Sequence, residues 1–421
     1  MGNSNSAATA DPRFDSATRA FTQNEIEELR SLFESLASQS HNNGEFVSSS
    51  IFKRCFGIHG ALGDRMFDLI TRGRHDQKLS FEDLVIAKAT YEKGLNNEIE
   101  EFMLQLLDVN GDGSLGRSDV KAVLCSILKD LFPRKDQESA QSTEFDINIM
   151  LNVATFSKSN VESDEKSMSL EDLKSWFNLL PSVRKYLGGL LTSPDQGRSG
   201  SQVPRLLNPE TASTSVLLRE EFAWLIGGVL SLQEQAEWKL LYNSSLNGQS
   251  FNTFMGSISG KCGPTVIIVK DEDGYIFGGY ASRPWERRSN FYGDMKSFLF
   301  QLYPKASIFR PTGANNSLQW FAVNYSSESI PNGIGFGGQV GHFGLFISAS
   351  FDQGHSFSCS TFGSPCLSKS NQIIPEVIEC WGIVTKAMQQ ERTDTVRGTV
   401  LERFKEERNM LNMVGIANSS E

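Results

Sequence analysis

The sequence predicts an α+β protein with an all-α domain in its front half, a β-sandwich with flanking helices in its second half, and a C-terminal helix. An Asp/Gly-rich stretch at residues 108–119 lies between two segments that have apolar residues at helical spacing. After Gly188 the chain becomes rich in Gly, Ser, Pro and Thr, and runs of β-branched and aromatic residues follow. Near the C-terminus, residues 389–414 again place apolar side chains on one helical face.

These patterns divide the 421 residues into five segments. We expect a flexible, lipidated N-terminus at 1–20, a helical domain at 21–187, a linker at 188–215, the sandwich domain at 216–386, and a helix with a tail at 387–421. The length allows two or three domains with cores of their own. Residues 1–186 contain 21 Lys and Arg against 29 Asp and Glu, so most of the net charge of −10 lies in the front half. An acidic front half suits cation binding and argues against nucleic acid, which requires a basic face.

The stretch at 108–119 has the ligand spacing of a calcium-binding loop. Asp108, Asn110 and Asp112 supply side-chain oxygens at loop positions 1, 3 and 5. Gly113 occupies position 6, where the chain has to turn sharply, and Ser114 offers its backbone carbonyl at position 7. The segments on either side, Glu98–Leu107 and Val120–Phe132, are amphipathic. This arrangement resembles an EF-hand.

The last position of the loop departs from the EF-hand pattern. Asp119 stands at position 12, where a glutamate usually binds the ion with both oxygens. Its side chain is one methylene shorter, so we expect Ca²⁺ affinity at the weak end of the roughly 10⁻⁷ to 10⁻⁵ M sensor range, with Mg²⁺ able to occupy the same site. An Asp/Gly-rich turn without an ion is the alternative. The predicted metal ligands are Asp108, Asn110, Asp112, Ser114 and Asp119.

Three weaker copies share the apolar frame of this loop but have poor ligands. They span Phe33–Phe52, Phe67–Leu84 and Ile149–Phe177, and are centred on Phe46, Leu79 and Met168. Counted along the chain with the 108–119 loop as the third, the second copy has Arg72 and Arg74 at ligand positions, where a positive charge repels a cation. The fourth copy offers Val161, Ser163 and Glu165 at its ligand positions. We therefore expect four helix-loop-helix units, of which one binds metal, with Leu115 pairing its loop to a neighbour. A plain helical domain is the alternative for the first and fourth copies.

The N-terminus fits a lipid-attachment pattern. The chain begins Met-Gly-Asn-Ser-Asn-Ser, in which Gly2 and Ser6 match N-myristoylation. One myristoyl chain gives only marginal membrane binding, about 10⁴ M⁻¹, so a membrane-resident partner is expected to assist. No apolar run is long enough to span a bilayer, and we expect neither a transmembrane helix nor a signal peptide. The six cysteines form no CxxC pair, which fits reduced thiols in the cytosol.

The second half has strand and turn signals. An apolar helix is expected at Val216–Leu232. Thr265–Val269 and Tyr275–Tyr280 form a predicted hairpin around the turn at Asp271–Gly274. Further strands are expected at Trp320–Val323 and Phe343–Ile347. Two packed sheets with a few helices would bury the many aromatic residues of this region.

This half contains no recognisable catalytic constellation, and we predict no catalytic or cofactor-binding residue. Gly333–Gly338 fits GxGxxG, but the following residues have a strand pattern where pyrophosphate binding needs a helix N-terminus, so we interpret it as a Gly-rich loop. His342 and His355 are interpreted as structural. Cys359 and Cys366 lack basic neighbours that would lower a thiol pKa.

Short motifs follow one another in order along the second half: Trp238-Lys-Leu-Leu-Tyr242, Gly248-Gln-Ser-Phe251, Gly263-Pro-Thr265, Phe277-Gly-Gly-Tyr-Ala281, Trp285, Phe298-Leu-Phe300, Gly341 to Phe346, Gly354-His-Ser356, Cys359-Ser-Thr-Phe362 and Glu379-Cys-Trp381. Together they resemble a TLDc domain. The whole layout is similar to the EF-hand TLDc proteins, which include MTOR-associated lysosomal proteins and plant proteins. The resemblance implies a β-sandwich, an adaptor or regulator role, a link to oxidation resistance and growth signalling, and binding to the vacuolar proton-pumping ATPase.

The tail places Val396, Val400, Phe404 and Leu411 near one helical face, which suits packing on its own domain or docking to a partner protein. We expect a calcium-modulated, non-enzymatic adaptor on the cytosolic face of a lysosome-type or vacuole-type membrane. Protein contacts would come from the TLDc domain and the tail, and membrane contact from the N-myristoyl group. Two alternatives stay open: a calcium-regulated enzyme of oxidant defence, and a soluble calcium-responsive protein of the nucleus.

Overall fold

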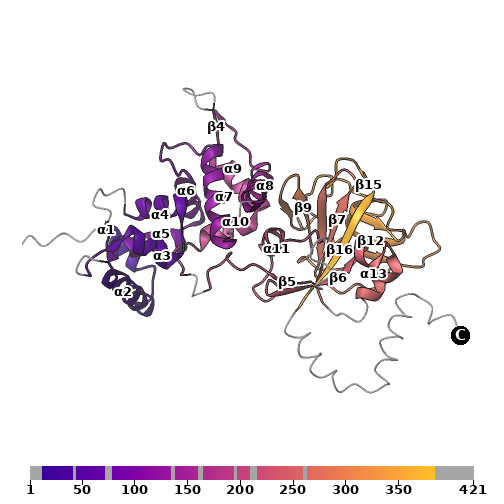
Figure 1. Ribbon diagram of the computed structural model, residues 1–421, viewed down its shortest axis with the longest axis horizontal. Helices are drawn as coiled ribbons and strands as arrows, with labels where there is room; N and C mark the ends of the chain where they lie inside the picture. The colour runs from indigo at the N-terminus through magenta and orange to yellow at the C-terminus, as the bar shows by residue number, and fades with distance from the viewer. Residues whose placement is uncertain are drawn as a thin grey trace, which may run out of the picture. The chain divides into compact units, whose positions relative to one another are not determined.

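The computed structural model describes residues 12–40, 44–71, 78–133, 138–159, 165–193, 197–208, 216–258 and 263–384 (Figure 1). The chain divides into two compact units, one formed by residues 1–178 and 183–201 and the other by residues 179–182 and 202–421. Within the described residues, helices dominate the first unit and strands the second. The predicted α+β class with a helical front half is therefore confirmed.

In the part of the front half that the structure describes, the helices form four helix-loop-helix units in the predicted order: α2–α3, α4–α5, α6–α7 and α8–α9. Short strands lie in three of the intervening loops. The bounds are α1 Pro12–Thr18, α2 Gln23–Ser38, β1 Val47–Ser48, α3 Ser49–Phe56, α4 Gly60–Ile70, β2 Lys78–Leu79, α5 Phe81–Glu92, α6 Asn96–Leu107, α7 Arg117–Leu131, α8 Glu138–Leu151, β3 Lys158–Ser159, β4 Lys166–Ser167, α9 Leu170–Leu179 and α10 Pro181–Gly188.

Local capping explains where two of these helices begin. Thr22 precedes α2; its hydroxyl accepts the Glu25 N–H, and the Glu25 carboxylate accepts the Thr22 N–H. Ser80 and Asp83 repeat this reciprocal arrangement at the start of α5. Such a capping box satisfies two amide donors that have no partner within the helix. The sequence thus sets the first turn of both helices.

The first two loops are joined by a short antiparallel pairing of β1 with β2, in which Val47 lies opposite Leu79. The sequence placed Phe46 at the centre of the first loop, and this was wrong by one residue. Successive side chains of a strand point to opposite faces, so a one-residue shift exchanges the buried and exposed positions. Val47 is fully buried, whereas Phe46 is partly exposed and has the Lys78 ammonium 5.2 Å from its ring centroid.

Two segments that were expected to be irregular have regular or buried structure. Helix α1 lies inside the segment 1–20, which was expected to be flexible. Residues 188–208, expected as linker, include the buried Arg198, whose guanidinium donates to the carbonyls of Thr192 and Leu190. They also include β5, which pairs in parallel with β6. A buried guanidinium has to find acceptors, and backbone carbonyls of the same segment provide them.

The described residues of the second unit form two sheets and three helices. The seven-stranded sheet has the order β10-β9-β8-β7-β16-β6-β5, and the five-stranded sheet has the order β11-β12-β13-β14-β15. The bounds are β5 Arg205–Leu207, α11 Glu220–Gly227, β6 Glu237–Asn243, α12 Ser244–Asn247, α13 Phe251–Ile258, β7 Thr265–Asp271, β8 Ile276–Ala281, β9 Phe298–Tyr303, β10 Ser307–Phe309, β11 Gln319–Ala322, β12 Gly333–Gln339, β13 His342–Ser348, β14 Gly354–His355, β15 Gln372–Ile373 and β16 Pro375–Ile383.

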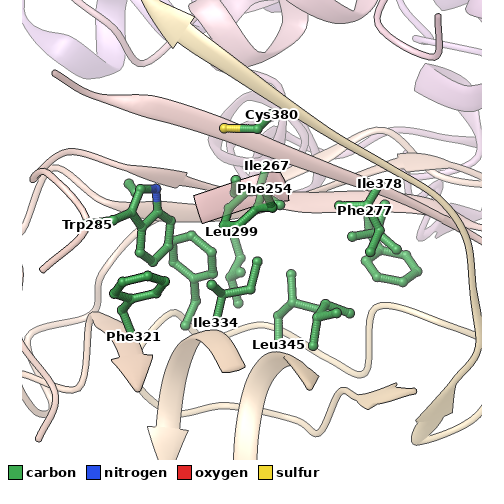
Figure 2. Close-up of a cluster of buried hydrophobic side chains, with 14 of the residues drawn as sticks. Phe254, Ile267, Phe277, Trp285, Leu299, Phe321, Ile334, Leu345, Ile378 and Cys380 are labelled. Atoms are coloured by element: carbon green, nitrogen blue, oxygen red, sulfur yellow. The ribbon is translucent and has the colours of Figure 1, made fainter. Parts of the chain in front are cut away.

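The two sheets pack face to face around one apolar core, which confirms the predicted sandwich. Figure 2 shows Ile267 and Cys380 of the larger sheet facing Ile334 and Leu345 of the smaller sheet. Phe254 of α13 belongs to the same core. Stacked sheets of this kind interdigitate the side chains of their inner faces.

Some predictions for individual elements of this unit are confirmed and others are wrong. The predicted hairpin is confirmed as β7 and β8, and the two further strands as β11 and β13. The Gly-rich loop was wrong, because Gly333–Gln339 is strand β12, paired on both sides. A Cβ at Gly335 would lie 2.9 Å from the Phe343 ring, so glycine here serves close packing. The helix expected at Val216–Leu232 is shorter and spans Glu220–Gly227.

Candidate functional site

The loop between α6 and α7 carries all five predicted metal ligands. Asp108 directly follows α6 as its C-cap, and Asp119 lies in the first turn of α7. Gly111 and Gly113 have φ angles of +74° and +83°, which side-chain-bearing residues rarely adopt. The chain between the two helices therefore curls back on itself, as the spacing of the motif predicts.

The side-chain oxygens of this loop accept hydrogen bonds from the loop's own amides. Asp108 accepts the Gly111 N–H on Oδ1 at 2.9 Å and the Gly113 N–H on Oδ2 at 3.1 Å. Asn110 Oδ1 accepts the Asp112 N–H at 2.9 Å. These contacts turn the oxygens of positions 1 and 3 toward the interior of the loop, where an ion would have to bind.

The two remaining carboxylates are held in the same way. Asp112 Oδ1 accepts the Ser114 N–H at 2.7 Å, and Asp119 Oδ2 accepts the Gly116 N–H at 3.0 Å, which caps α7. Asp119 is buried, and this burial raises the pKa of its carboxyl, with the charges of Asp108 and Asp112 acting in the same direction. Two carboxylates, Asp108 and Asp119, are thus buried in a loop whose third carboxylate, Asp112, is exposed, and a bound cation would offset the charge that burial disfavours.

The donor types suit a hard cation, but the ligands are not assembled around one. Within the described part of the chain, no group of three His, Cys, Asp or Glu side chains lies close enough to hold a metal ion. Binding would therefore require the side-chain oxygens to come closer together than they are in this structure. One contact was not predicted: the guanidinium of Arg65, on α4, donates to Asp108 Oδ2 at 3.3 Å. Arg65 is 43 residues away in the sequence, and no local pattern indicates it.

The loop is joined to the fourth helix-loop-helix unit, as the sequence predicts. The Leu115 carbonyl accepts the Met168 N–H at 2.8 Å, and both side chains are buried. This contact parallels the pairing of Val47 with Leu79 in the first two loops. Movement of one loop is therefore coupled through backbone contact to its neighbour.

Several predicted features lie outside the described residues. They are Gly2, the tail at 387–421, Arg72 and Arg74 of the second loop, and Val161 and Ser163 of the fourth loop. Glu165, just before β4, is described and exposed. The lipid site and the docking helix thus stay predictions. No helix among the described residues is long and apolar enough to cross a membrane.

The residues of the second unit weighed as catalytic groups are built into its packing. His355 stacks on Phe346, with ring centroids 5.1 Å apart, and burial lowers the pKa of its imidazole. Its Nε2 atom is buried and has no hydrogen-bond partner among the described residues. Cys359 is 4% exposed and belongs to the core, and Cys366 donates its thiol to the carbonyls of Ser368 and Ser370.

A buried carboxylate was not predicted as a functional group. Glu379 is fully buried, and burial raises the pKa of its carboxyl. It accepts the backbone N–H groups of Leu217 and Leu218, the Asn243 amide and the Trp381 indole N–H. The first two contacts tie the segment before α11 to β16, and the Asn243 contact joins β16 to the end of β6, so the residue has a structural role that the Glu-Cys-Trp motif alone does not reveal.

Comparison with known proteins identifies the second unit. The model of the TLDc domain matches residues 211–384, against the predicted 216–386. The MTOR-associated protein MEAK7 of Danio rerio is 32% identical over 261 residues, which are 60% of this chain and 57% of that protein. Its Mus musculus counterpart is 31% identical over 257 residues, 59% of this chain and 55% of that protein.

The chain therefore matches little more than half the length of these relatives. Oxidation resistance protein 1 of Rattus norvegicus is 33% identical over 144 residues, 34% of this chain and 16% of that protein. With the sandwich fold, these matches identify the chain as a TLDc-domain protein related to the MTOR-associated protein MEAK7.

Proposed function

We propose that this protein is a non-enzymatic, calcium-responsive adaptor that associates with a membrane and binds proteins through its TLDc domain. The observation that carries the proposal is the α6–α7 loop. Its turn carries three carboxylates, of which Asp108 and Asp119 are buried, and its backbone contacts the neighbouring loop through Leu115 and Met168. Such a loop can pass a local change in charge to the rest of the helical unit.

The ion would be held by oxygens alone. Asp108, Asn110, Asp112 and Asp119 would supply side-chain ligands, and Ser114 its carbonyl, a donor set that Ca²⁺ prefers and Mg²⁺ shares. A bound cation would neutralise the carboxylate charge that burial disfavours in this loop. The response depends on a rearrangement that brings these oxygens together around the ion, because a ligand shifts only an equilibrium between states that it binds unequally.

The proposed partners are proteins. Relatives of this chain bear the names MTOR-associated protein and oxidation resistance protein, which support a regulatory role in growth signalling or oxidative stress. We propose that the TLDc domain, with the tail, binds the vacuolar proton-pumping ATPase on a lysosome-type or vacuole-type membrane. A myristoyl group on Gly2 would add the membrane contact, and Gly2→Ala should then move the protein from the membrane fraction to the supernatant.

Binding to purified pump tests the proposal directly. The immobilised chain is incubated with the pump at zero and saturating Ca²⁺, in parallel with the Asp112→Ala and Asp64→Ala variants. Asp64 is an exposed carboxylate on α4 that pairs with Lys53, so its loss controls for a change in net charge. We expect retention of the pump to change with Ca²⁺ in the wild type and in Asp64→Ala but not in Asp112→Ala. Absence of pump at every calcium level would refute the adaptor proposal for this partner.

The non-enzymatic part of the proposal rests on the surroundings of the cysteines. A thiol reacts with peroxide as an accessible thiolate, and Cys359 is buried in the sandwich core. We therefore expect the purified protein not to turn over hydrogen peroxide. Turnover that is abolished by Cys359→Ser or Cys366→Ser would instead establish an enzyme of oxidant defence. An unmodified N-terminus in mass spectrometry, with nuclear staining, would favour the soluble alternative.

A further inference from the structure

The guanidinium of Arg65 contacts the first ligand position of the proposed cation loop. Its Nη2 donates to Asp108 Oδ2 at 3.3 Å, and its Nε donates to the Gln105 carbonyl at 3.0 Å. The side chains are only 19% and 8% exposed, so solvent screens this ion pair less than one at the surface. A positive charge thus contacts the side chain that the proposed function assigns as the first ligand of the ion.

The surroundings of Arg65 form a fitted site for its guanidinium. Gln105 is in the last turn of α6, where helix carbonyls lack partners within the helix and attract cations. Gly111 also lies next to the guanidinium, since a Cβ at this position would be 3.0 Å from Arg65 Nη1. The left-handed backbone and missing side chain of Gly111 therefore leave the room that the guanidinium fills.

From this geometry we propose that Arg65 is an internal competitor for the cation. It occupies Asp108 Oδ2 when no ion is bound, and a metal ion that takes this oxygen has to displace or repel the guanidinium. The inference rests on the proposed cation site and names the residue that sets its affinity. It also identifies the contact through which ion binding affects other helices, because Arg65 belongs to α4 of the second helix-loop-helix unit.

Two consequences follow for the ion-bound protein. Calcium affinity is lowered by the energy of the Arg65–Asp108 contact, in addition to the effect of the short Asp119. Ion binding also releases α4 from the end of α6, so the second helix-loop-helix unit responds to an ion bound in the third. Loops whose ligand positions are poor are thereby still involved in the response.

Calorimetric titration of the full chain with CaCl₂ tests the proposal, with Arg65→Met and the matched control Arg54→Met. Arg54 is on α3 and donates to Gln39. Its replacement therefore removes the same charge from the same compact unit, but away from the loop. A charge-assisted hydrogen bond changes an equilibrium constant by about tenfold or more. We therefore expect Arg65→Met to bind Ca²⁺ about tenfold more tightly than the wild type, and Arg54→Met to bind nearly as the wild type does.

An affinity of Arg65→Met equal to or weaker than that of Arg54→Met would overturn the role of Arg65 and leave the cation site intact. Failure of all three proteins to bind Ca²⁺ would remove the site itself and the proposed function with it. If Arg65→Met does not fold, the ¹⁵N signal of the Arg65 Nε–H in the wild type provides the test. We expect this signal to shift on addition of CaCl₂; an unchanged signal in a protein that binds the ion contradicts the proposal.

Discussion

The close approach of strands β7 and β8 depends on Gly278, and we expect Gly278→Ala to destabilise the second unit severely. A Cβ at this position would lie 1.9 Å from the Ile267 carbonyl oxygen and 2.7 Å from Phe300 Cζ. Ordinary carbon contacts are about 3.5–4.0 Å, so the added methyl group cannot be accommodated by rotating a side chain. The strand itself has to move, which disturbs the ladder that pairs β8 with β7 and β9.

The expected loss in free energy of unfolding comes from the steric overlap of the added methyl group and from the hydrogen bonds that the strand movement disturbs. An added methyl group in a well-packed core costs about 1–3 kcal/mol, and each disturbed ladder bond a further 0.5–1.5 kcal/mol or so. We expect a loss of roughly 3–5 kcal/mol in the free energy of unfolding of this unit. Since about 1 kcal/mol moves the melting temperature of a domain of this size by 2–4 °C, the midpoint should fall by about 6–20 °C.

Gly274→Ala is the matched control. Gly274 is in the turn between the same two strands, has a φ of +82°, and has open space where a Cβ would be. Its replacement costs only backbone strain, about 1–2 kcal/mol. Thermal unfolding followed by near-ultraviolet circular dichroism compares the two variants. If Gly278→Ala melts within 2–3 °C of Gly274→Ala, by the same conversion, the account of sheet packing is wrong.

Three further predictions concern the loop and the aromatic cluster. Asp119→Glu should tighten Ca²⁺ binding several-fold, because the longer side chain can place both oxygens on the ion; calorimetry giving a weaker affinity would contradict this. Leu115→Ala should destabilise the helical unit by about 2–5 kcal/mol in chemical unfolding, whereas exposed Leu95→Ala should change little. Burial lowers the pKa of His355, so the stability that its neutral form contributes is present at pH 7 and is lost as pH falls below the unfolded value of 6.5. The melting temperature of the wild type should therefore fall between pH 7 and 5.5, and that of His355→Phe should fall less. A variant whose melting temperature falls as much as that of the wild type would refute this prediction.

The sequence predicted those elements whose side chains alternate or repeat visibly. The hairpin of β7 and β8 has β-branched residues on both sides of an Asp-Gly turn, so local chemistry alone specifies it. Strand β12 was missed because its alternation is hidden by glycines, which are there to admit Phe343 and Phe346 of the paired strand. In a sequence, such glycines indicate a loop, and only the packing of the sheet shows why strand β12 needs them.

The candidate site shows the same division. The spacing of Asp108, Asn110 and Asp112 is local, and the structure places these residues in one turn, as expected. Arg65 and the burial of Asp119 arise from contacts between helices, which no single-sequence pattern contains. The burial of Arg198 in a segment expected as linker has the same origin. Local ligand chemistry is thus predictable, whereas the groups that tune it are set by tertiary packing.

The most direct test of a calcium-responsive protein is a calorimetric titration of the purified chain with Ca²⁺ in the presence of excess Mg²⁺, alongside Asp108→Ala and Asp64→Ala. We expect the wild type and Asp64→Ala to bind one Ca²⁺ with a Kd of roughly 10⁻⁵ M, the weak end of the sensor range. Asp108→Ala should not bind. Absence of binding in the wild type, or binding that persists in Asp108→Ala, would contradict the account and leave the helical unit as a scaffold for the TLDc domain.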